Sequence, residues 1–242
     1  MPNVTVEEAG SASDADVAAV HSEAFIEAVK RYDRGEPVEN SLRFGLGTPD
    51  DPIFEGMHEA AAGVCGASLA AAAGIASGRF AHAFNPAGGL HHARRSEASG
   101  FCIYNDPAVA IAHALLLQPS WRVMYIDVDV HHGDGVQWIF YEDPRVLTVS
   151  LHQSGRYLYP GTGFPDETGE GQAEGTAINV PLPPYTSDDD YLRALERTVT
   201  SAADAFQPDL IVTQLGADTH HGDPLANLAL SMGAYPRMAK IL

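Results

Sequence analysis

The chain has 242 residues, of which 45% are hydrophobic and 19% charged, and its formal net charge is −18. This length and balance indicate a globular protein with a sizeable core, while the acid excess argues against direct binding of nucleic acid. The two cysteines predict no disulfide framework and fit a reducing cytoplasm. The start of the chain lacks the basic and apolar parts of a signal peptide, and the Ala- and Gly-rich stretch at 60–76 is too weakly apolar to predict a membrane span.

The first half of the chain has helical periodicity, and the second half alternates strands with helices. Apolar spacing predicts helices over residues 14–32, 53–78 and 107–117, with polar, turn-rich segments between them. The later predicted elements are strands at 122–126, 146–151 and 209–215 and helices at 135–141 and 188–206. Residues 155–175 form a long Gly- and Pro-rich loop of the kind that is often functional. This alternation predicts an α/β fold with a mainly parallel sheet. Without a repeat or linker, we expect one domain over 1–242.

The run from Tyr125 to Gly135 places carboxylates and imidazoles directly after a buried strand. Asp127, Asp129 and His131 are spaced by two, so an extended chain would carry all three on one face as candidate metal ligands. Oxygen and nitrogen donors suit zinc, and also iron or manganese. The alternative is a set of hydrogen-bonded polar residues around a tight glycine turn.

Polar residues also follow the other two predicted strands. Sites form beyond the carboxyl ends of parallel strands, so segments far apart in the sequence can meet there. Asp218, after the third strand, is therefore a further candidate ligand, although an Asp in that place also serves as a helix cap or turn former.

Two adjacent histidines, His91 and His92, follow a Gly-Gly-Leu segment. They fit metal ligands, an acid–base pair or a surface pair. Imidazoles are suited to taking a proton from water and giving one to a leaving amine. Phe101, beside a glycine, and Tyr159, just before a Pro-Gly-Thr-Gly segment, fit either a core position or a substrate wall.

Together these segments resemble the histone deacetylase superfamily of zinc amidohydrolases. The resemblance covers nearly the whole chain and rests on residues 88–94, 97–106, 127–135, 149–152, 159–163, 216–218 and 222–225. Within the superfamily, residues 135–141 and 155–160 look most like the bacterial acetoin-utilization branch. The resemblance implies the arginase/deacetylase fold, a mainly parallel sheet flanked by helices in three α/β/α layers.

The resemblance also assigns the metal ligands. It implies that Asp129, His131 and Asp218 hold zinc, with Fe²⁺ as an alternative metal, and it places Asp127 outside the ligand set. It further implies a monovalent-cation site for K⁺, built largely from backbone carbonyls of Asp127, Asp129, His131, Ser150 and Leu151.

The acid–base and substrate groups follow from the same resemblance. His92 is the expected general base and then acid, with His91 acting mainly electrostatically; Asp127 supports His91, and Asp134 supports His92. The positions that match the narrow tunnel for the acetylated chain are Gly100, Phe101 and Tyr159.

The implied function is zinc-dependent hydrolysis of the acetyl amide of acetyl-lysine in proteins, in the context of acetoin or acetyl-CoA metabolism. The expected partner is an acetylated protein or a small acetylated amine, with no nucleic acid and no membrane. One alternative is acetylpolyamine hydrolysis. A binuclear manganese ureohydrolase of the same fold is disfavoured by the His91–His92 pair and by Phe101.

A non-catalytic binding module is also an alternative. The family's catalytic Tyr lies in a Gly-rich segment downstream of 222–225, and this chain ends at Leu242. The start also looks short of the family's first strand. We therefore expect an incomplete domain, and Tyr235 is not assigned the catalytic role.

Overall fold

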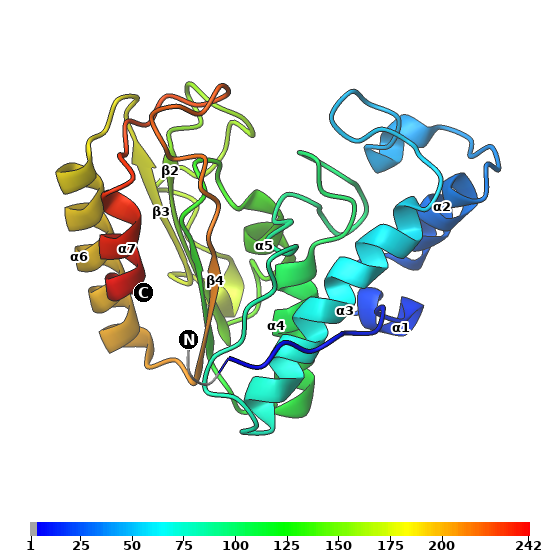
Figure 1. The fold of residues 1–242 in the computed structure, drawn as a ribbon, viewed down its shortest axis with the longest axis horizontal. Coiled ribbons are helices and arrows are strands. Elements are labelled where there is room, and N and C mark those ends of the chain that lie inside the picture. Colours follow the sequence, from blue (N-terminus) through cyan, green and yellow to red (C-terminus); the bar gives the residue numbers. More distant parts are fainter. Residues whose placement is uncertain (1–3) are drawn as a thin grey trace. The chain divides into compact units, whose positions relative to one another are not determined.

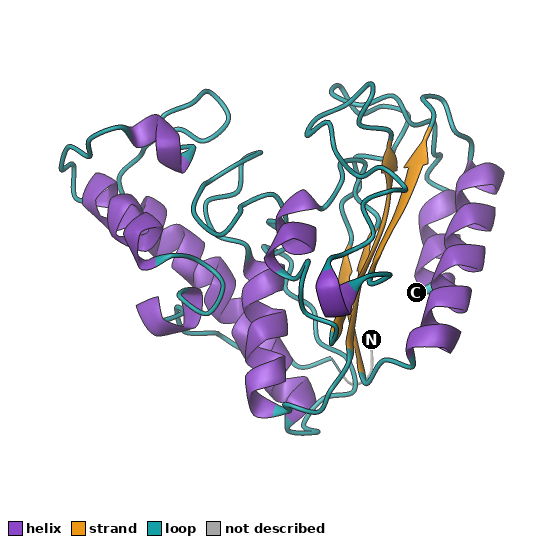
Figure 2. Cartoon of the chain, turned by 180° about the vertical axis from the view of Figure 1, so that it is seen from behind, coloured by secondary structure: helices purple, strands orange, loops and turns teal. Residues whose placement is uncertain are grey.

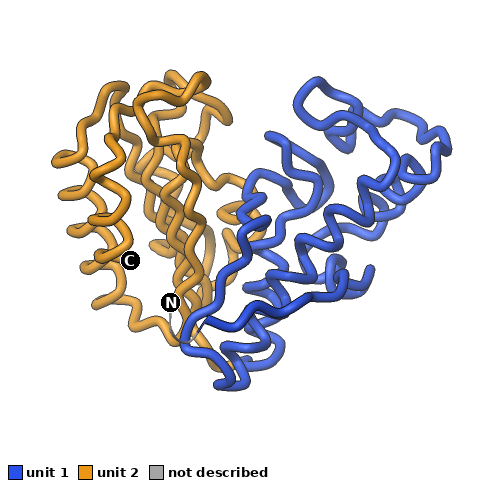
Figure 3. Tube along the Cα trace, viewed as in Figure 1, with its two compact units in different colours: residues 1–119 blue, residues 120–242 orange. Residues whose placement is uncertain are grey.

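The computed structural model describes residues 4–242. The chain forms two compact units, Met1–Pro119 and Ser120–Leu242 (Figure 3). The single domain expected over 1–242 stays a prediction, because compact units can belong to one domain.

Unit 1 is helical. Its elements are α1 (Asp14–Val17), α2 (Glu23–Asp33), the 3-10 turn η1 (Ser41–Phe44), α3 (Met57–Ala76) and α4 (Asp106–Leu117) (Figure 1). The single helix expected over 14–32 is wrong, because the chain breaks between α1 and α2. Ser22 caps α2 by accepting the backbone N–H of Phe25, and the buried His21 turns its Nδ1 to the carbonyl of Arg94 at 2.9 Å. Hydrophobic spacing alone does not register such a cap inside a helical pattern.

Helices α3 and α4 pack along each other. The start of α3 follows Gly56, whose φ of 84° is in the left-handed region, so the helix is shorter than the expected 53–78. By length and composition α3 could cross a membrane, a test that core helices of soluble proteins also pass. Its buried face includes Ala61, Cys65 and Ser68. The hydroxyl of Ser68 donates a hydrogen bond to Asp106 of α4.

Unit 2 contains a four-stranded parallel sheet with strand order β3-β2-β1-β4. The strands are β1 (Val123–Asp127), β2 (Val146–Gln153), β3 (Ala177–Leu182) and β4 (Leu210–Gln214). Three of the four match the expected strands, and the parallel pairing confirms the predicted fold class. Strand β3 was not among the expected elements; it contains a proline and mixes buried with half-buried positions.

Helices lie on both sides of this sheet within unit 2. They are α5 (Asp134–Ile139), α6 (Asp188–Phe206) and α7 (Ala234–Ile241), and the short turn η2 spans Gly171–Ala173. Helices α6 and α7 lie together on one side of the sheet, and α5 lies on the other (Figures 1 and 2). One face of α6, including Leu195 and Val199, packs into the core with Ile126 and Val149 of the inner strands.

Both inner strands, β1 and β2, are buried along their whole length. Strands covered on both faces are apolar nearly throughout, yet these two end in polar residues. Asp127 is the last residue of β1, and Ser150 and His152 lie near the end of β2. Polar side chains therefore gather at the carboxyl edge of the sheet.

Candidate metal centre and histidine pair

The segment after β1 curls through a series of short-range hydrogen bonds. Asp127 accepts the backbone N–H of Asp129 on Oδ1 at 3.1 Å, and Asp129 accepts that of His131 on Oδ1 at 2.8 Å. Each carboxylate thus satisfies an amide two residues further on, as Asp side chains do in turns. This local pairing fixes the backbone that carries Asp129 and His131.

Asp129, His131 and Asp218 form a cluster in which one ligand atom from each residue lies within 4.8 Å of the others. Nδ1 of His131 lies 3.0 Å from Oδ1 of Asp129 and 3.0 Å from Oδ2 of Asp218. Asp218 is held from its other side, because its Oδ1 accepts the backbone N–H of Val130 at 2.8 Å. Two ligands bound at 2.0–2.1 Å to a tetrahedral zinc lie about 3.3 Å apart. The donor set and its spacing therefore fit a metal such as zinc.

The protonation of His131 reflects its two carboxylate neighbours. Burial alone would lower its pKa, but the hydrogen bonds and charges of Asp129 and Asp218 outweigh burial and raise the pKa to about 9. Burial and the charge of Asp129 raise the pKa of Asp218, while the hydrogen bond from His131 opposes that rise. A proton on Nδ1 here occupies the place where a cation would bind.

Asp127 lies outside this cluster. It is fully buried, and its Oδ2 accepts the hydroxyl of Tyr125 at 2.7 Å. Even spacing along the chain had made it a third candidate ligand, whereas the structure groups Asp129 and His131 with Asp218. The assignment of these three as ligands remains a prediction supported by this geometry.

Two residues that shape the centre were not singled out from the sequence. Gln214, the last residue of β4, donates from Nε2 to Oδ2 of Asp129 at 3.0 Å. Gly216 leaves room for the same carboxylate, since a Cβ there would lie 2.1 Å from Oδ2 of Asp129. A polar residue ending a strand was the available signal for Gln214, but the role of Gly216 depends on a contact across two segments.

The residues expected at the monovalent-cation site come from neighbouring strands. Asp127 of β1 is the direct register partner of Ser150 of β2, and Leu151 follows it. All three are buried. Their backbone carbonyls could contribute to one site, and the K⁺ assignment remains a prediction.

Loop 155–175 is held to α5 by a partly buried polar network. Glu167 accepts the backbone N–H groups of Gly163 and Phe164 and the side-chain amide of Gln137. Tyr159, in the same loop, is 42% exposed, and its ring centroid lies 6.5 Å from that of His131. This position beside the cluster is compatible with its expected role as a substrate wall.

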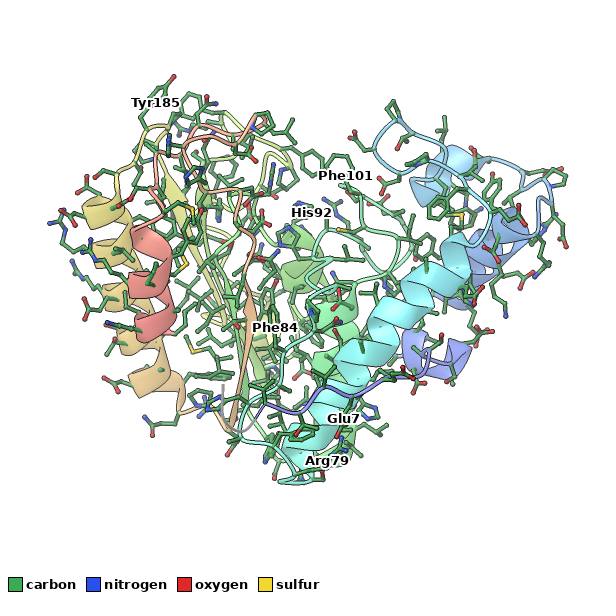
Figure 4. All side chains as sticks on the ribbon, viewed as in Figure 1. Glu7, Arg79, Phe84, His92, Phe101 and Tyr185 are labelled. Atoms are coloured by element: carbon green, nitrogen blue, oxygen red, sulfur yellow. The ribbon has the colours of Figure 1, made fainter. Side chains whose placement is uncertain are left out.

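The histidine pair lies in unit 1, on the segment that connects α3 to α4 in the sequence; His92 is labelled in Figure 4. Both rings are buried, and Nε2 of His91 is 3.1 Å from Nε2 of His92. The surface-pair alternative is therefore wrong. Asp134, the expected partner of His92, is fully buried at the start of α5 in unit 2, and that pairing remains a prediction.

Gly100 and Phe101 form the tip of a tight turn in unit 1. Ser99 and Cys102 exchange two backbone hydrogen bonds, and the two residues between them have φ values of 54° and 69°. A bulky residue is rare in this left-handed region. Phe101 is nevertheless 64% exposed, so burial of its side chain contributes little stability (Figure 4). An exposed aromatic ring held in a strained turn fits a binding role better than a packing role.

Comparison with known proteins places the whole chain in one family. A model of the histone deacetylase domain matches residues 1–242. The chain is 48% identical over 235 residues to the acetoin utilization protein AcuC of Bacillus subtilis, covering 96% of this chain and 60% of that protein. It is 40% identical to AcuC of Staphylococcus aureus strain MRSA252, covering 90% of this chain and 56% of that protein. The resemblance to the acetoin-utilization branch is thereby confirmed.

Solved structures agree with the fold. A histone deacetylase homologue from Aquifex aeolicus superposes with a TM-score of 0.90 at 34% identity, covering 96% of this chain and 63% of that one. The HD domain of HDA15 gives a TM-score of 0.87 at 32% identity, covering 98% and 67%. The chain spans about 60% of the length of the curated relatives it matches. With a family model matched from end to end and this agreement in structure, the chain belongs to the histone deacetylase family and has the arginase/deacetylase fold.

Proposed function

We propose that this chain carries the metal centre and the acid–base pair of a zinc-dependent deacetylase that hydrolyses the acetyl amide of acetyl-lysine in proteins. The observation that carries the proposal is the cluster of Asp129, His131 and Asp218. Catalytic zinc sites have three protein ligands and an open position, whereas structural sites have four. The cluster, in a member of this family, supports a catalytic site, with Fe²⁺ as the alternative metal.

A zinc ion bound there supplies Lewis-acid polarisation of the acetyl carbonyl and a lowered pKa for water. The remaining work falls to the side chains of this chain. His92 takes the proton from the attacking water and passes it to the leaving amine, and His91 stabilises the developing charge.

The geometry of the pair supports an acid–base role for the two rings. At an Nε2–Nε2 separation of 3.1 Å, one ring donates a hydrogen bond to the other. This contact gives a proton a direct path between the two rings. Asp127 and Asp134 are the proposed carboxylate partners, which would fix the tautomers of the rings.

The substrate proposal rests on the candidate walls. Gly100 and Phe101 form an exposed turn in unit 1, and Tyr159 lies near His131 in unit 2. Aromatic walls suit the methylene chain of acetyl-lysine, which is apolar up to its amide. Acetylated polyamines present a similar chain, so they are the competing small substrates.

Release of acetate tests the reaction. The chain, and any longer natural form of it, should release acetate from an acetyl-lysine peptide faster than from acetylputrescine. His92→Ala should abolish turnover with the metal content unchanged. Preference for acetylputrescine would move the function to polyamine hydrolysis. Metal binding without acetate from either substrate would favour a non-catalytic binding module.

We also propose the cellular setting. Relationship to AcuC supports a role in acetoin or acetyl-CoA metabolism, and a chain whose two cysteines are both free and buried is suited to the cytoplasm. K⁺ at the site of Asp127, Ser150 and Leu151 is part of the same proposal. Dependence of turnover on K⁺ over Na⁺ at constant ionic strength would support it.

A further inference from the structure

The histidine pair lies on a segment that has no regular secondary structure. Residues 81–93 contain no helix or strand. They lead from the turn after α3 to an isolated β-bridge between Arg94 and Glu97. An acid–base pair must be held close to its productive geometry, and a misplacement of about 1 Å can cost about a hundredfold in rate. Contacts from outside the segment must therefore fix its backbone.

Asp106, at the start of α4, holds the backbone immediately before the pair. Its Oδ1 accepts the N–H groups of Gly89 at 3.0 Å and Leu90 at 2.8 Å. Its Oδ2 accepts the hydroxyl of Ser68 on α3 at 2.5 Å. The side chain is 2% exposed, and no step of the proposed reaction uses it.

Asn105 holds the backbone of the pair itself. Its side-chain amide donates from Nδ2 to the carbonyls of His91 at 3.1 Å and Ala93 at 2.9 Å. Its Oδ1 caps α4 by accepting the N–H of Ala108 at 3.0 Å. The two neighbouring side chains therefore fasten the histidine segment to one helix end by four hydrogen bonds, two to N–H groups and two to carbonyls.

Gly88 completes the arrangement by leaving space for the carboxylate. A Cβ at Gly88 would lie 2.4 Å from Oδ2 of Asp106 and 2.8 Å from Nδ2 of Asn85. The backbone before the pair can approach the carboxylate this closely only without a side chain. The segment from Gly88 to His92 and the pair Asn105-Asp106, which are apart in the sequence, thus contact each other directly in the fold.

We infer that Asn105 and Asp106 are positioning residues that fix the backbone of His91 and His92 and thereby the relation between the two rings. The inference rests on the proposed function for its kinetic consequence. Its structural consequence, the placement of the rings, does not depend on that function.

Asn105→Ser is the main test. Serine caps a helix about as well as asparagine, so α4 keeps its cap while the two donors to His91 and Ala93 are lost. Tyr104→Phe is the matched control, because it removes a neighbouring, partly buried hydrogen bond between the Tyr104 hydroxyl and Nδ1 of His58 and leaves the histidine segment untouched.

Two further variants distinguish a displaced histidine pair from general damage to the fold. Asp106→Asn keeps an oxygen for the N–H groups of Gly89 and Leu90 and loses only the acceptor for the hydroxyl of Ser68, so the ring signals of His91 and His92 should stay close to those of wild type. Gly88→Ala removes no hydrogen-bonding group but drives a methyl group against the carboxylate of Asp106. It should resemble Asn105→Ser.

The readouts are the ring ¹⁵N and ¹H signals of His91 and His92 and the kinetics on an acetyl-lysine peptide. For Asn105→Ser and Gly88→Ala we expect shifted ring signals, kcat about a hundredfold lower, a KM close to wild type and an unchanged metal content. Unshifted ring signals in both variants, or equal effects from Tyr104→Phe, would overturn the inference. If the wild-type chain releases no acetate, the proposed function fails while the ring signals still decide the positioning role.

Discussion

Replacing Gly216 with alanine should damage the metal centre without altering any ligand. The added methyl carbon would lie 2.1 Å from Oδ2 of Asp129, 2.7 Å from its Cγ and 3.0 Å from its Cβ. Contacts below 3.0 Å are not tolerated, so the carboxylate or the backbone around it must move by about 1 Å. That carboxylate is also held by Gln214 and lies against His131, which restricts its escape.

The expected cost follows from the tolerance of metal sites. Distances between a metal and its ligands hold to about ±0.2 Å. Moving the Asp129 carboxylate by about 1 Å should therefore weaken zinc binding by at least the ten- to hundredfold that follows the loss of a residue hydrogen-bonded to a ligand. This corresponds to about 1.4–2.7 kcal/mol. Competition with a fluorescent chelator would measure the zinc affinity of Gly216→Ala against wild type.

Gly63→Ala is the control for the same chemical change. No atom lies within 4 Å of a Cβ at Gly63, which sits inside α3, and zinc affinity should stay at the wild-type value. Wild-type affinity in Gly216→Ala as well would refute the reasoning, because it would mean that Asp129 is not a ligand or that its position does not matter.

Two further predictions concern the same centre. The carboxylates beside His131 outweigh its burial and raise its pKa to about 9, from an ordinary 6.5. Its proton therefore stabilises the folded metal-free chain fully below pH 6.5, and this contribution is lost as the pH rises through 9. Urea unfolding of the metal-free chain, measured in the presence of a chelator, should show the free energy of unfolding falling over this pH range in wild type and falling less in His131→Gln. An equal fall in both would count against a stabilising proton on His131. Gln214→Leu, which removes the donor to Asp129, should lower zinc affinity by about ten- to hundredfold, and an unchanged chelator titration would argue against a supporting role.

The fold was predictable where one segment carries its own signal. The inner strands β1 and β2 are apolar runs that end in polar residues, and α6 combines an acidic first turn with a regular apolar face. The strand β3 carries Pro181 and Asn179 and has no continuous apolar run, so it gives no such signal. The break between α1 and α2 depends on His21 reaching Arg94, a contact that helical periodicity does not contain.

The candidate site was predictable in composition and less so in arrangement. Even spacing grouped Asp127 with Asp129 and His131, whereas the family resemblance set Asp218 in place of Asp127. The structure gathers Asp129, His131 and Asp218 and turns Asp127 toward Tyr125. Contacts between distant segments decide these roles, and no single stretch of sequence records them.

The metal content of the purified chain tests the central claim most directly. Elemental analysis should find about one zinc ion per chain, lost in Asp218→Asn and retained in Asp204→Asn, which changes an exposed carboxylate on α6. Two manganese ions per chain, or full zinc in Asp218→Asn, would contradict the assignment of Asp129, His131 and Asp218 as a deacetylase metal site.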